Sequence, residues 1–227
     1  MSVTKLVLQT AATGAVGVIF LGALLFIPAG TLDYWQAWVF IAVFVVSTSV
    51  IGIYLALKDP ALLERRKQIG PTAEQGTAQR IIISLGILSF LGVMVFSALD
   101  HRFGWSPVPP VVSLVGAALV ALGLFVDLLV FRENTYGASN IRVEEDQQVI
   151  STGPYAVVRH PMYVGVLIMV VGTPLALGSW WGLLVVAVTV PVLIWRILDE
   201  EELLRRELPG YTDYTQHVRY RLVPHVW

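Results

Sequence analysis

Long apolar runs separated by short polar connections dominate the chain. A helix needs about 20 apolar residues to cross the hydrocarbon core of a bilayer. Lipid also forces each spanning segment to satisfy its own backbone hydrogen bonds, which favours helices. Four runs of roughly this length predict four transmembrane helices, over residues 11–27, 35–57, 81–99 and 108–131.

A fifth apolar stretch, residues 162–198, is too long for one such helix. Its middle holds residues of the kind that mark turns, namely Gly172, Pro174, Gly178 and Ser179. We therefore predict a helical hairpin here. The expected fold is an all-α integral membrane protein with a single domain over residues 1–227, in which four transmembrane helices (1–131) precede the hairpin and a C-terminal cap (132–227).

The composition agrees with a membrane protein. Of the 227 residues, 56% are hydrophobic and 14% are charged, whereas soluble domains average about 45–50% apolar and about 25% charged residues. Mean hydropathy is +0.72. The chain has no cysteine, which excludes disulfides, thiolate metal sites and cysteine nucleophiles. The net charge of −1 gives no reason to propose nucleic acid as a partner.

Basic residues gather in three segments, residues 58–80, 132–161 and 205–221. An even number of predicted crossings separates these segments, so all three lie on one side of the membrane together with Lys5, while the opposite connections hold only Arg102. The positive-inside rule then places both termini in the cytoplasm, as in a bacterial inner-membrane protein. Fixing the topology is also the simplest role for most of these arginines.

The beginning and the first long loop of the chain each allow two interpretations. Lys5 before an apolar run also fits a cleaved signal peptide, but no small-residue cleavage site stands out and further spans follow, so we expect a retained helix. In the 61–79 loop, Leu62, Leu63 and Ile69 fit either a segment on the membrane surface or a plain solvated loop.

A compact motif opens the hairpin. Gly153-Pro154 marks a turn, and His160-Pro161 then starts the apolar leg, with Pro161 at a first helical position where its missing N–H costs nothing. The free N–H groups of such a helix start suit an anionic or acceptor group on a ligand. Tyr and His are also common in the aromatic belt at a membrane surface. The residues alone therefore leave open both a ligand site and an interfacial helix start.

A second polar cluster ends the hairpin. Arg196 and Glu200 are four residues apart and share a helix face. Arg196 lies just inside the apolar leg, where a charge needs a partner or a purpose. It either extends to the interface and pairs with Glu200, or it holds an anionic substrate while Glu200 holds a cationic or hydrogen-bonding ligand group.

The tail carries tyrosines and arginines, at Tyr211, Tyr214, Arg219 and Arg221. These residues fit phosphate or lipid headgroups, or a surface cap over the site. The chain contains no Gly-rich dinucleotide fingerprint or P-loop, no metal-ligand spacing among its four histidines and no nucleophile-elbow serine. We therefore expect a reaction without a metal or a covalent intermediate.

These motifs resemble the isoprenylcysteine carboxyl methyltransferase family and its relatives, the phospholipid N-methyltransferases. The resemblance rests on residues 151–155 and 159–165, then on Glu200-Glu201, then on Tyr211 and Tyr214. It covers roughly residues 132–227, whereas the first four spans match only as membrane helices.

The resemblance implies a membrane methyltransferase with an S-adenosylmethionine pocket at the cytosolic face. The implied cofactor contacts are Asn140, Gln147, Gln148, Val149, Ile150, Tyr155, His160, Pro161, Met162, Tyr163 and Glu200. Arg196 would face the substrate, and Arg196, Glu200 and Glu201 would be the catalytic residues. The acceptor is a lipophilic or small molecule, drawn from among carboxylates, thiols, amines and phospholipid headgroups. With an amine or thiol, Glu200 or Glu201 would have to serve as base.

Two other functions remain open at this stage. A nicotinamide-dependent membrane reductase of the sterol reductase type has a similar C-terminal architecture, and Arg219 and Arg221 would suit a 2′-phosphate. A non-enzymatic membrane protein would bind no cofactor, and its Tyr155, His160 and Glu200 side chains would be dispensable.

Overall fold

The computed structural model describes residues 3–67, 70–74, 76–137 and 147–227, and within these its regular elements are all helices. The α-helices are α1 (Val3–Ala29), α2 (Trp35–Lys58), α3 (Pro60–Lys67), α4 (Thr77–Phe103), α5 (Pro110–Glu133), α6 (Pro161–Ala176), α7 (Gly182–Glu207) and α8 (Tyr211–His217). Two short 3₁₀ helices, η1 (Pro71–Ala73) and η2 (Gly153–Ala156), lie in the connections.

The predicted spans over residues 35–57, 81–99 and 108–131 and the predicted hairpin are confirmed. Within the described residues, α2, α4, α5 and α7 are long and apolar enough to cross a membrane, and α1 covers the first predicted span. The hairpin consists of α6 and α7, with its turn over residues 177–181. These helices are those of an integral membrane protein.

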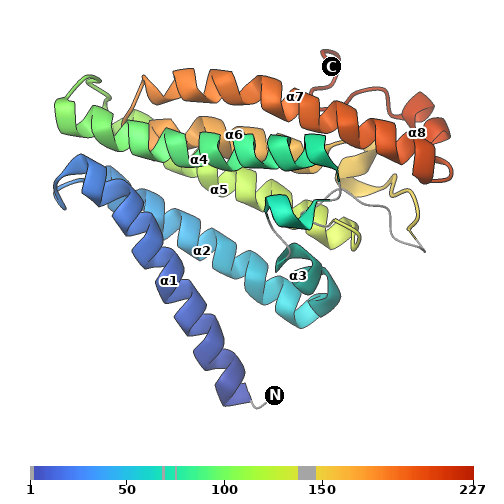
Figure 1. Cartoon of the computed structure of the whole chain (residues 1–227), viewed down its shortest axis with the longest axis horizontal. Helices are drawn as coiled ribbons and strands as arrows, with labels where there is room; N and C mark the ends of the chain where they lie inside the picture. The colour runs from blue at the N-terminus through green and yellow to red at the C-terminus, as the bar shows by residue number, and fades with distance from the viewer. Residues whose placement is uncertain (1–2, 68–69, 75, 138–146) are drawn as a thin grey trace.

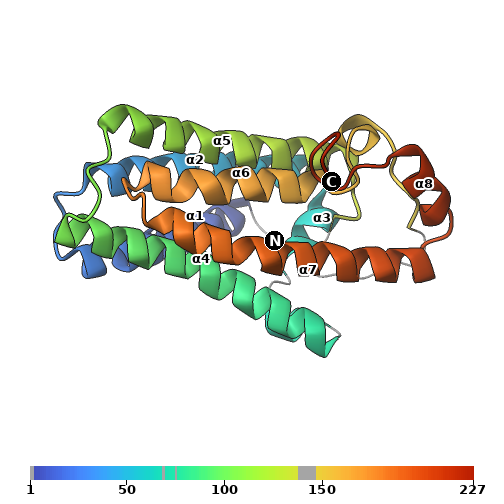
Figure 2. The same ribbon diagram turned by 90° about the horizontal axis from the view of Figure 1, so that it is seen from above.

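The long helices run side by side, and the polar segments gather at one end of the bundle (Figures 1 and 2). We name this the polar end; it holds α3, η2, α8 and the C-terminal tail. The three basic segments thus meet at one end, as their spacing predicted. The N-terminal part of α1 diverges from the other helices in Figure 1.

The opposite end is tied by side chains from three connections. The Tyr34 hydroxyl donates to the carbonyl of Leu177 (2.6 Å). Buried Asp100 accepts hydrogen bonds from Ser106 (2.6 Å) and Ser179. Exposed tryptophans surround these connections, at Trp35, Trp38, Trp105, Trp180 and Trp181, as expected where a membrane meets water.

Glycines let α5 and α6 approach each other closely. A Cβ atom at Gly116 would lie 2.2 Å from the backbone nitrogen of Ala176, and one at Gly123 would lie 2.5 Å from the carbonyl oxygen of Gly165. Small residues are the usual means by which membrane helices bring their backbones together. This contact fixes α6, whose first turn carries the candidate site, against α5.

In the 61–79 segment, the structure places one of the three apolar residues inside the protein. Leu62 is fully buried and packs with Leu55, Val130 and Phe131, and Leu63 packs against the same cluster. Glu74 is also buried. Ile69 lies outside the described residues. Helix α3 folds back on the bundle because this apolar contact is available between α2 and α5.

The close approach of α5 and α6 predicts that the effect of a Gly→Ala substitution on stability depends on its position. Gly116→Ala should lower the free energy of unfolding by about 1–3 kcal/mol, the usual cost of overpacking. Gly52→Ala is the control, because nothing lies within 4 Å of the added Cβ. Since alanine favours a helix more than glycine does, this variant should keep the wild-type free energy of unfolding or raise it by about 0.5–1 kcal/mol. Thermal unfolding in detergent measures both, and equal effects would contradict the backbone contact.

Candidate functional site

A cavity of about 540 Å³ opens at the polar end and extends between the membrane helices. Its polar part is lined by residues 147–150, η2, the first turn of α6, the end of α7 and α8. Its apolar part lies among α4, α6 and α7, lined by Ile82, Ile83, Ile87, Phe90, Val166, Met169, Val170, Val192 and Leu193. One space therefore connects polar groups with an apolar interior.

The structure brings most of the predicted site residues to this cavity. They are Gln147, Gln148, Val149, Ile150, Tyr155, His160, Pro161, Met162, Tyr163, Arg196 and Glu200. Asn140 lies outside the described residues. Glu201 does not line the cavity, since one residue along a helix turns the side chain by about 100°.

The first turn of α6 is joined to α7 at the cavity wall. Helix α6 begins at Pro161 with His160 as its N-cap residue, as the sequence predicted. The Tyr163 hydroxyl donates a 2.6 Å hydrogen bond to Glu200. Among the described residues the Glu200 carboxylate forms no ion pair. Glu200 therefore presents a negative charge to the cavity.

Glu201 is the centre of an ion cluster behind this wall. Its side chain is 2% exposed, and its two oxygens lie 2.7 Å from Arg159, 3.0 Å from Arg221, and 3.3 Å from both His160 and Arg205. A buried charge is tolerated when it is paired in this way. Glu201 thus links α7 to the start of α6 and to the tail.

Arg159 completes the link to the tail. Its guanidinium donates to the carbonyls of Val218 (2.8 Å) and Arg219 (2.7 Å). The backbone N–H groups of Arg159 and His160 donate to the carbonyls of Tyr220 and Arg221. The tail was expected either to bind phosphate or lipid headgroups or to form a surface cap, and these contacts favour the cap.

Arg196 is buried, and two of its partners lie in the N-terminal half of the chain. Its guanidinium lies 2.8 Å from the Glu74 carboxylate and donates to the side-chain carbonyl of Gln79. It therefore does not extend to the interface as one interpretation expected. Sequence reasoning missed Glu74, because nothing in a polar loop indicates a contact so far along the chain.

Tyr155 is fixed by two hydrogen bonds. Asn134 donates to its hydroxyl (2.8 Å), and the Tyr214 hydroxyl donates to its carbonyl (2.7 Å). Burial raises the pKa of Tyr155 to about 12, so its hydroxyl stays neutral. Asn134 also lines the cavity and was not predicted.

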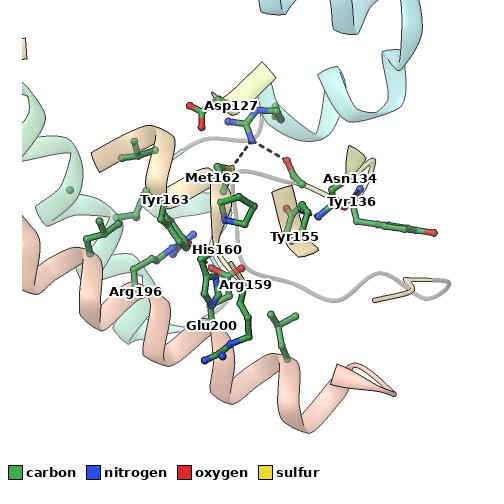
Figure 3. A pocket seen from close by; sticks show the side chains of 18 of the residues that line it. Asp127, Asn134, Tyr136, Tyr155, Arg159, His160, Met162, Tyr163, Arg196 and Glu200 are labelled. Carbon is green, nitrogen blue, oxygen red and sulfur yellow. Dashed lines mark hydrogen bonds between the residues drawn. The ribbon is translucent and has the colours of Figure 1, made fainter. Parts of the chain in front are cut away.

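Asp127 lies across the cavity from Arg196 and Glu200 (Figure 3). Arg66 also lines the cavity. The guanidinium of Arg66 lies 4.1 Å from the centre of the Phe131 ring and donates to the carbonyl of Gly137 (3.0 Å). Burial lowers the pKa of Arg66. Asp127 is the one carboxylate in the apolar run of residues 108–131, whereas the sequence does not distinguish Arg66 from the charges that set topology.

Comparisons with known proteins bear on the same part of the chain. No curated protein matches the sequence. Among solved structures, the eukaryotic intramembrane Ras methyltransferase, isoprenylcysteine carboxyl methyltransferase, is similar at 17% identity and a TM-score of 0.44, over 100% of this chain and 88% of that chain.

The family comparison covers the candidate site. Residues 111–209 match the family model of the phospholipid methyltransferases. This range contains α6, α7, nearly all of α5 and every residue predicted for the site. The resemblance to membrane methyltransferases that the motifs indicated is therefore confirmed as a similarity of residues 111–209 to the phospholipid methyltransferases.

Proposed function

We propose that the protein transfers a methyl group from S-adenosylmethionine to a lipophilic or small acceptor in the membrane. The observation that carries the proposal is the single cavity that joins the residues implied as cofactor contacts to an apolar interior. Nearly all of its polar lining comes from the segment that matches the phospholipid methyltransferases.

The lining fits the proposed cofactor. A volume of about 540 Å³ falls in the range of about 300–1,000 Å³ that is usual for ligand pockets. The Glu200 carboxylate suits a positively charged sulfur or an ammonium group. Tyr211 lines the cavity, and its buried hydroxyl has no hydrogen-bond partner among the described residues. Residues 147–150, Tyr155, His160 and Tyr163 would complete the contacts.

The protein's own contribution is binding, orientation and exclusion of water. When bound, the cofactor supplies a methyl group on a positive sulfur, which bonds to the acceptor's electron pair as the carbon–sulfur bond breaks to leave a neutral thioether. Glu200, oriented by Tyr163, favours the positive charge in a medium where charge interactions are strong. The enclosing helices hold the reactants together and keep water out.

Glu201 acts in this proposal as a positioning residue. The sequence suggested a catalytic role, but its carboxylate is bound by surrounding cations and does not line the cavity. Through Arg159 and His160 it fixes the start of α6, and through Arg221 it fixes the tail that covers the site. Glu200 is then the carboxylate left to contact ligands.

The acceptor is proposed to reach the cavity with its apolar part among α4, α6 and α7. An apolar chain on the acceptor would be removed from water in such an interior, which favours binding. The positive-inside rule supports placing the polar end, and hence the cofactor site, in the cytoplasm. The membrane itself would then supply the lipophilic acceptor.

Ligand-dependent unfolding tests the proposal. S-adenosylhomocysteine should raise the unfolding temperature of the detergent-solubilised protein, because a ligand that binds only the folded state stabilises it, by about 2.7 kcal/mol at a hundredfold excess over Kd. NADPH should not. Stabilisation by NADPH alone would favour a reductase, and a response to neither ligand would contradict the enzyme proposal.

The charge of Glu200 should matter most for the charged form of the cofactor. Glu200→Gln is expected to weaken S-adenosylmethionine binding roughly tenfold or more, since a hydrogen bond to a charged group contributes about 1.5–3 kcal/mol. The loss should be smaller for S-adenosylhomocysteine, whose sulfur is neutral. Calorimetric titration gives both constants. Exposed Glu202→Gln on the same helix is the matched control, and equal losses in the two variants would refute the role of Glu200.

Removing the charge of Glu201 should destabilise the fold itself. Glu201→Gln leaves the buried Arg159 guanidinium without its counter-charge, and breaking a buried pair in this way costs about 3–5 kcal/mol. Glu207→Gln removes an exposed pair with Arg206 and should cost little. Denaturation followed by near-ultraviolet circular dichroism compares the two, and a fully stable Glu201→Gln variant without methyl transfer would instead support the catalytic role.

A further inference from the structure

An ion pair between the two halves of the chain forms part of the cavity wall. The Arg196 and Glu74 side chains are 8% and 1% exposed, and their charged atoms lie 2.8 Å apart. Gln79 accepts a further hydrogen bond from Arg196. Arg196 lines the cavity, so its charge would meet any ligand that enters there.

The Glu74 side of this pair is built from the turn between η1 and α4. The backbone carbonyl of Glu74 accepts a 3.0 Å hydrogen bond from Arg80, which fixes the turn. Gln79 lies in the first turn of α4. Glu74 and Gln79 therefore both come from outside residues 111–209, the segment that matches the phospholipid methyltransferases.

The charges around this wall do not favour an anion. Arg196 is a buried positive charge whose counter-charge is already supplied by Glu74 at 2.8 Å, and the Glu200 carboxylate lines the same cavity. An anionic headgroup beside Arg196 would therefore enter a poorly solvated site where the nearest cation is already paired, which is costly.

Building on the proposed methyltransferase function, we propose that Glu74 determines acceptor specificity. By holding the charge of Arg196, it makes the part of the cavity beside Arg196 select apolar-chain acceptors with an uncharged headgroup or an amine, which loses its proton before its electron pair takes the methyl group, and disfavour acceptors with a carboxylate. Specificity of this kind depends on disfavouring the wrong ligand as much as on attracting the right one. Arg196 is then a neutralised wall residue and not a clamp for an acceptor carboxylate.

A pair of chain-matched probes tests this selectivity without any cofactor. Octylamine and octanoate are titrated into the detergent-solubilised full chain at fixed detergent, and the ratio of their dissociation constants is followed by thermal shift. The wild type should favour octylamine at least tenfold. Glu74→Gln should move the ratio at least tenfold toward octanoate. Exposed Glu64→Gln in the same connection is the control and should leave the ratio unchanged.

A second variant keeps the test valid if Glu74→Gln does not fold. Gln79→Glu adds a negative charge beside the same guanidinium and should shift the ratio further toward octylamine. A wild-type preference for octanoate, or a ratio that neither variant moves, would overturn the proposal. Because the probes report without cofactor, failure of S-adenosylhomocysteine to bind would refute the methyltransferase function separately from the selectivity of the cavity.

Discussion

A single buried carboxylate holds the polar end of this membrane protein together. Glu201 gathers Arg159, His160 and Arg221 around it, so the beginning of α6, the end of α7 and the C-terminal tail share one anchor. The beginning of α6 and the end of α7 also line the cavity. The cluster is therefore a scaffold for the site: it sets where His160 and Tyr163 lie, while the neighbouring Glu200 remains available to a ligand.

Membrane helices explain how such a polar site can form beside an apolar interior. The helices satisfy their own backbone hydrogen bonds, so side chains at their ends are free to build contacts between distant parts of the sequence. The hairpin of α6 and α7 returns the chain to the end where it began, and the polar residues on either side of the hairpin meet there. The cavity then continues from these residues into the space between apolar side chains.

Much of this arrangement could be predicted from the sequence. Apolar runs of membrane length gave the spans, and glycine and proline in the middle of residues 162–198 gave the hairpin. The spacing of His160, Tyr163 and Glu200 within recognisable motifs placed them in one site. All of these signals are local, or repeat at helical spacing, and so survive without knowledge of tertiary contacts.

The remaining parts depended on packing that no local pattern encodes. The contact of Glu74 with Arg196 joins a loop to a distant helix, and Arg66 resembled any other topology-setting charge. Glu200 and Glu201 are adjacent in sequence and similar in chemistry, yet their positions on α7 direct one to the cavity and the other to the ion cluster. Only the orientation of the helix distinguishes them.

The backbone contact between α5 and α6 also has a mechanical consequence. Where two helices touch through main-chain atoms, as at Gly116 and Ala176, neither can rotate or bend inward without a collision, so the pair behaves as one stiff wall. Helices α4 and α7 border the same cavity through longer side chains such as Ile87 and Leu193, which can change rotamer. Widening of the cavity to admit a bulky molecule is therefore expected on the α4 and α7 side, with α5 and α6 as the fixed frame.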